Sequence, residues 1–62
     1  MGEIIGTIVS KSGSQYIVKW EDNKVSVRKY GTFGWDCVAR KVHKVDALST
    51  AQGVIDYQNP LF

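Results

Sequence analysis

The chain has 62 residues, enough for one domain with a small core, and 44% of them are hydrophobic. The lone cysteine, Cys37, cannot form an intrachain disulfide, and one cysteine with one histidine is too few for a structural zinc site. All eight basic residues lie between Lys11 and Lys44 with only three acidic residues among them, so this part carries a net charge of +5. A basic middle between acidic ends suits an anionic partner.

Three strands are expected in the first half of the chain, within a single domain over residues 1–62. Residues 3–11 are rich in Ile, Val and Thr, and residues 16–21 and 24–31 alternate between apolar and polar side chains. Residues 22–23, Asp-Asn, are suited to a two-residue hairpin turn. Either face of the first strand could be buried, because both carry apolar side chains.

The two-residue turn fixes the register of the second hairpin. One face then carries mostly apolar side chains, and the other carries polar and basic ones. The pairs expected on the first face are Trp20–Val25, Val18–Val27 and Tyr16–Lys29, and those on the second are Lys19–Ser26 and Ile17–Arg28.

A helix is expected over residues 36–52, followed by a tail over residues 54–62. Apolar residues recur there at spacings of three and four, which is typical of one helical face. Leu48 and Ala51 form a second apolar stripe on another face of this helix. The tail contains Pro60, which excludes a regular central strand, so it either covers the core or docks on a partner.

The sequence carries no catalytic or cofactor motif. His43 has no nucleophile on the same helical face, and the scattered glycines do not form a phosphate-binding loop. The residues therefore predict a protein that is not an enzyme and that uses neither a cofactor nor a metal.

The stretch YIVKWEDNKVSVRKYGTF, running into the expected helix, resembles the arm-binding domain of tyrosine recombinases and the plant ethylene-response-factor DNA-binding domain. The resemblance covers roughly residues 13–52 and implies an α+β fold, a three-stranded antiparallel sheet packed on a C-terminal helix. It also implies that the free sheet face enters the DNA major groove, with Arg reading guanine and Lys contacting phosphates. The residues that carry it are Tyr16, Val18, Arg28, Gly31, Thr32, Phe33 and Ala39. The nucleic-acid-binding residues that it implies are Lys11, Lys19, Ser26, Arg28 and Tyr30.

A second stretch, GTIVSKSGSQYIVKWEDNKVSVRKY, is similar to the opening strands of small all-β barrels of the Src-homology or Tudor type. That resemblance implies a barrel that binds protein or peptide in an aromatic groove. The residues lining the groove would be Tyr16, Trp20, Tyr30 and Trp35. The barrel needs residues 36–46 to be a strand, which the helical spacing opposes.

We therefore expect a small DNA-binding or regulatory protein that uses the basic face of its sheet. The alternative is a protein-interaction module, an inhibitor or adaptor that docks through its helix and tail, and a homodimer is left open. The absence of a long apolar run and of a basic leader predicts a cytoplasmic protein. The residues of the alternative docking surface are Leu48, Ala51, Ile55, Tyr57, Leu61 and Phe62.

Overall fold

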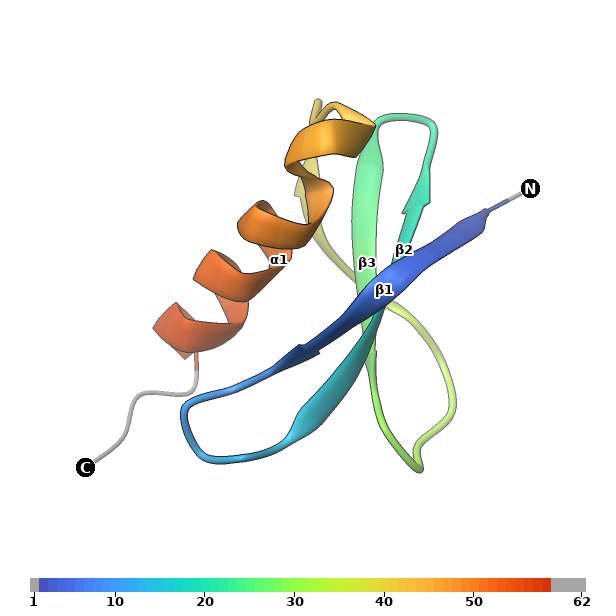
Figure 1. Ribbon diagram of the computed structural model, residues 1–62. Coiled ribbons are helices and arrows are strands. Elements are labelled where there is room, and N and C mark those ends of the chain that lie inside the picture. Colours follow the sequence, from blue (N-terminus) through green and yellow to red (C-terminus); the bar gives the residue numbers. More distant parts are fainter. Residues whose placement is uncertain (1, 59–62) are drawn as a thin grey trace.

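Four strands and one helix make up residues 2–58, the part of the chain that this computed structural model describes (Figure 1). The strands form one antiparallel sheet in the order β1-β2-β3-β4, and α1 lies across one face of it. The expected α+β fold, an antiparallel sheet with one C-terminal helix, is confirmed, but the sheet has four strands rather than three. The elements are β1 (Glu3–Val9), β2 (Gln15–Glu21), β3 (Lys24–Lys29), β4 (Asp36–Arg40) and α1 (Lys44–Gln58).

The hairpin of β2 and β3 has the register predicted from the sequence, including Trp20 opposite Val25 and Lys19 opposite Ser26. Its two central turn residues, Asp22 and Asn23, have φ values of 50° and 60°. Positive φ at both positions is the geometry of a type I′ turn, whose twist matches that of the flanking strands. The turn therefore holds the two faces of the sheet in fixed positions.

Replacing Asn23 with glycine is expected to stabilise the protein by up to about 1 kcal/mol, because glycine adopts positive φ without a steric penalty. Urea unfolding followed by far-ultraviolet circular dichroism would measure the change. A lower unfolding midpoint would contradict the turn geometry.

A β-bulge at Ile5 settles which side of β1 is buried. The register of β1 against β2 shifts between Ile4 and Gly6, so Ile4 lies opposite Lys19, whereas Ile8 lies opposite Tyr16. Ile4 is 61% exposed and Ile8 only 7%. The even spacing of these two residues suggests a common face, but the extra residue places them on opposite faces.

The helix predicted over residues 36–52 is wrong in its first part, because residues 36–40 form β4. The register of β4 against β3 shifts at one point: Ala39 lies opposite Val25 and Cys37 opposite Ser26, which leaves Val38 as the extra residue. Consecutive Val38 and Ala39 therefore both pack against the core. This break in the two-residue alternation produces the apolar spacing that imitates a helix.

The helix begins only at Lys44 and extends through the first residues of the expected tail, 54–58. Lys41 has φ 58°, a left-handed conformation that turns the chain away from the direction of β4. The backbone N–H of Val42 then donates to Asn23 O at 2.9 Å. The all-β alternative correctly needs a strand at residues 36–40, but its barrel is wrong, because residues 44–58 form α1 and the sheet is open between β1 and β4. Within residues 2–58, no helix combines the length and apolar character that a membrane crossing requires.

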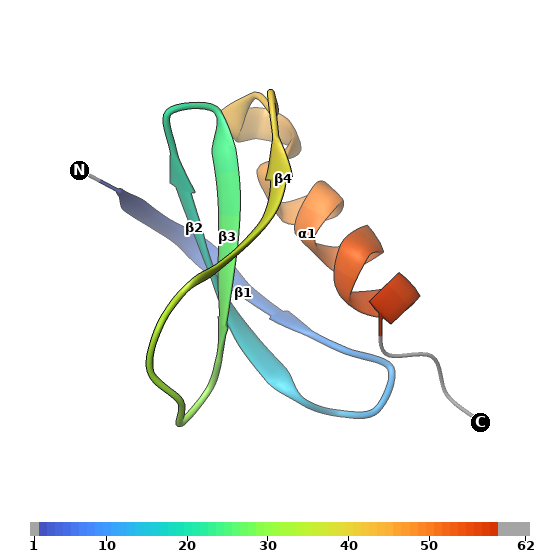
Figure 2. The same ribbon diagram turned by 180° about the vertical axis from the view of Figure 1, so that it is seen from behind.

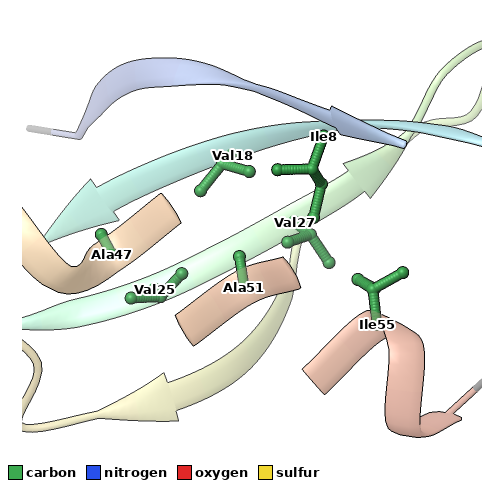
Figure 3. Packing of buried hydrophobic residues seen from close by; sticks show 7 residues of the cluster. All are labelled: Ile8, Val18, Val25, Val27, Ala47, Ala51 and Ile55. Atoms are coloured by element: carbon green, nitrogen blue, oxygen red, sulfur yellow. The ribbon is translucent and has the colours of Figure 1, made fainter. Parts of the chain in front are cut away.

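The core lies between the sheet and one side of α1 (Figure 3). The helix contributes two alanines and an isoleucine at a spacing of four, and small alanines let its backbone approach the strands closely. The indole Nε1 of Trp20 donates to Val42 O at 2.9 Å, which ties β2 to the connection before α1. The buried residues are Ile8, Val18, Val25, Val27, Ala47, Ala51 and Ile55.

Candidate functional site

The side of the sheet turned away from α1 is called here the open face. Side chains alternate between the two faces of a strand, and Val18, Val25 and Val27 point into the core. Their neighbours along β2 and β3 therefore point away from the helix. On these two strands the open face carries Gln15, Ile17, Lys19, Glu21, Lys24, Ser26 and Arg28.

Two cations of the open face contact the ring of Trp35. The Lys19 Nζ atom lies 4.7 Å from the centroid of the ring, and the Arg28 Cζ atom lies 4.9 Å from it. Lys19 comes from β2, Arg28 from β3 and Trp35 from the residue before β4, so the sheet brings three separate segments together. Cation–π attraction holds two positive charges beside a half-buried indole ring.

A second pair of cations lies farther along the same face. Lys24 is directly opposite Arg40 in the β3–β4 register, and both side chains are exposed. Like charges in directly opposed positions repel and destabilise a sheet. Glu21 supplies one acidic group: it lies opposite Lys24 in the β2–β3 register, and its Oε1 lies 3.8 Å from Lys19 Nζ. The strands of the open face therefore carry four cations and one carboxylate, and this excess of positive charge suits an anionic partner.

The loop between β3 and β4 carries two strongly exposed aromatic side chains. Tyr30 is 63% exposed and Phe33 is 99% exposed. Gly31 and Gly34 adopt φ values of 86° and 87°, which give the loop its sharp bends around Phe33. Figure 2 shows this loop extending from the end of the sheet, away from α1. Phe33 is thus free to contact another molecule.

A surface groove of about 340 Å³ lies at the same end of the sheet. Arg28 is adjacent to it, because Arg28 lies opposite Ile17 in the β2–β3 register. The groove therefore combines apolar and aromatic walls with a neighbouring cation. Its walls come from Thr7, Val9, Gln15, Tyr16, Ile17 and Tyr30.

The structure brings together most of the predicted nucleic-acid-binding residues. Lys19, Ser26 and Arg28 share the open face, and Tyr30 lines the groove at its end. Lys11 lies apart from the strands, in the turn between β1 and β2. Three features were missed by sequence reasoning: Trp35 against Lys19 and Arg28, Arg40 opposite Lys24, and the exposed Phe33. The first two depend on β4, which the sequence did not reveal.

The described residues of the alternative docking surface on the helix do not form a continuous exposed patch. Ala51 and Ile55 are 0% and 2% exposed, so the core already covers them. Leu48 packs over Gly6, where an added Cβ atom would lie 3.2 Å from Leu48 Cδ2. Tyr57 alone of the described members is strongly exposed, at 87%. Leu61 and Phe62 lie outside the described residues.

Metal-ligating side chains do not gather in the described part of the chain. Among residues 2–58, no group of three His, Cys, Asp or Glu side chains is arranged to hold a metal ion. Cys37 is exposed, and its Sγ atom lies 3.6 Å from Ala39 O. The open face therefore remains the candidate site with the most features in one place.

Comparison with known proteins adds no family to this picture. No protein-family model, no curated protein and no solved structure matches the chain. The likenesses suggested by the sequence remain predictions, and the function has to be inferred from the geometry of the open face.

Proposed function

We propose that this protein is a non-catalytic DNA-binding protein that uses the open face of its sheet. The observation that carries the proposal is the placement of Lys19 and Arg28 within 4.7 and 4.9 Å of the Trp35 ring on a face that α1 leaves uncovered. In nucleic-acid complexes, Lys and Arg side chains contact phosphates, and aromatic rings contact bases.

The charge pattern of the open face supports a polyanionic partner. Lys24 lies between Glu21 on β2 and Arg40 on β4, and Lys19 and Arg28 lie on the neighbouring part of the face. A DNA strand presents regularly spaced phosphates and can neutralise several such cations at once. Binding would then release counterions from the DNA and neutralise the excess positive charge of the open face.

The polar groups of the open face suit separate tasks in such a complex. Arg28 has a planar guanidinium that can donate two parallel hydrogen bonds to one phosphate or to a guanine edge. Lys19 supplies a compact charge that suits phosphate. Ser26 lies opposite Lys19, and its hydroxyl can donate to an oxygen or accept from a base amine.

Fluorescence anisotropy with labelled DNA tests the proposal directly. We expect the purified protein to bind with a dissociation constant in the micromolar range at about 50 mM salt and to weaken steeply towards about 200 mM. Two or more phosphate contacts predict a slope of log K against log salt of about −1.4 or steeper. If neither single-stranded nor duplex DNA binds at low salt, the proposal is wrong.

A further inference from the structure

We propose that the open face prefers single-stranded DNA, and that unpaired bases stack on Phe33 and Trp35. The inference rests on the proposed function and names the form of DNA that the site selects. It follows from the aromatic side chains of the loop between β3 and β4, of which the proposed function uses only Trp35.

The ring of Phe33 is almost entirely exposed to solvent. Its side chain is 99% exposed, so it contributes no apolar burial to the core of the free protein. Thr32 Oγ1 donates to Lys29 O at 2.7 Å, and the backbone N–H of Thr32 donates to the same oxygen at 3.0 Å. These bonds shape the turn immediately before Phe33. An aromatic ring presented on an ordered turn is a stacking surface that needs little reorganisation to receive a base.

Trp35 lies beside two cations that could contact the phosphate of a nucleotide stacked on its ring. Lys19 and Arg28 both contact the ring, and the residue remains partly exposed. A nucleotide stacked on the exposed part of the indole would place its sugar-phosphate within reach of these side chains. Phe33 and Trp35 are two residues apart, so two neighbouring bases can be contacted from one loop.

The groove beside Arg28 is a further surface on which the ring of a base could stack. Val9 and Tyr30, which line it, are 52% and 63% exposed. The aromatic and aliphatic walls suit the faces of a base, and the polar side chain of Gln15 is available at the rim. The chain therefore offers stacking surfaces on both sides of the Arg28 side chain.

These surfaces fit an unpaired strand better than a duplex. In a duplex, neighbouring base pairs cover both faces of each base, so Phe33 and Trp35 would reach a base only after unstacking. In a single strand the base faces are accessible, and aromatic stacking with a basic groove is a common mode of recognition. Phosphate contacts alone would not distinguish the two forms in this way.

The test compares three labelled ligands of equal length: a single strand, its duplex, and a single strand in which alternate bases are replaced by abasic sites. We expect the intact single strand to bind at least about fivefold more tightly than the other two, which corresponds to the loss of one stacked base. The abasic strand keeps its phosphates, so it isolates the contribution of the bases.

Variants of the loop assign the effect to particular rings. Phe33→Ala is expected to weaken single-strand binding at least about fivefold, with an unchanged salt slope and an unchanged circular dichroism spectrum, because the side chain is exposed. Trp35→Ala should weaken binding similarly, and Trp35→Phe should restore most of it. The phenylalanine variant separates a stacking role from loss of the fold.

The outcomes separate this inference from the proposed function. Failure of all three ligands to bind would overturn both. If the duplex or the abasic strand binds as tightly as the intact single strand, or if Phe33→Ala binds normally, base stacking is wrong while DNA binding through phosphates stands.

Discussion

Replacing Ile55 with alanine is expected to remove most of the protein's stability, so that a substantial fraction is unfolded at 25 °C. Ile55 is 2% exposed and is among the largest fully buried side chains of the core. Removing its buried methyl and methylene groups leaves a cavity and costs about 2–5 kcal/mol. A chain of this size, without a disulfide or a metal, rarely has more than about 3–5 kcal/mol of total stability. Urea unfolding followed by tryptophan fluorescence and circular dichroism would measure the loss.

Val45→Ala is the matched control for this prediction. It removes a branched aliphatic side chain from the same helix, but Val45 is 89% exposed. Alanine has the higher helix propensity, so the free energy of unfolding should stay the same or rise by a few tenths of a kcal/mol. If Ile55→Ala unfolds at the wild-type urea concentration, α1 does not pack on the sheet in the described way.

The hairpin of β2 and β3 could be predicted because its information is local. A two-residue turn and a strict alternation together allow only one register, and a shift by one residue would bury Lys19 and expose Val18. The same reasoning placed Lys19, Ser26 and Arg28 on one face. It needed no knowledge of the remaining elements, because the signal lies within residues 15–29.

The bulges could not be predicted, since each inserts one residue into an otherwise regular alternation. At Val38 the insertion places two consecutive apolar residues towards the core, and the resulting spacing is that of a helix. At Ile5 it separates Ile4 from Ile8. Whether a chain accommodates such a residue depends on the neighbouring strand, which a periodicity argument does not include.

Missing β4 also hid the most informative part of the site. Only the fourth strand places Arg40 opposite Lys24, and only the loop that leads into it carries Trp35 over Lys19 and Arg28. Without β4, the sequence gives Trp35 no position relative to Lys19 and Arg28. As the residue before an edge strand, it lies against Lys19 and Arg28 on the open face, where we propose that it takes part in recognition.

The double variant Lys19→Gln/Arg28→Gln is expected to lose most DNA binding at low salt, at least about tenfold in affinity. Both cations lie on the open face against Trp35, and each is proposed to contact a phosphate. Loss of two phosphate contacts should reduce the slope of log K against log salt by about 1.4 for a single strand and about 1.8 for a duplex. Anisotropy titrations at several salt concentrations measure both the affinity and the slope.

The matched control is the double variant Lys29→Gln/Lys41→Asn, which leaves the side chains of the open face unchanged. Arg40 is not used in the control, because it belongs to the open face. Lys29 lies opposite Tyr16 on the helix side of the sheet, and asparagine tolerates the positive φ of 58° at Lys41. Each double variant lowers the formal net charge of +2 by two, so the overall charge is matched. Equal losses in both would mean that DNA responds to the total charge of the protein and would overturn the assigned site. A loss confined to Lys19 and Arg28 would mean that the path of the phosphates crosses the open face beside Trp35.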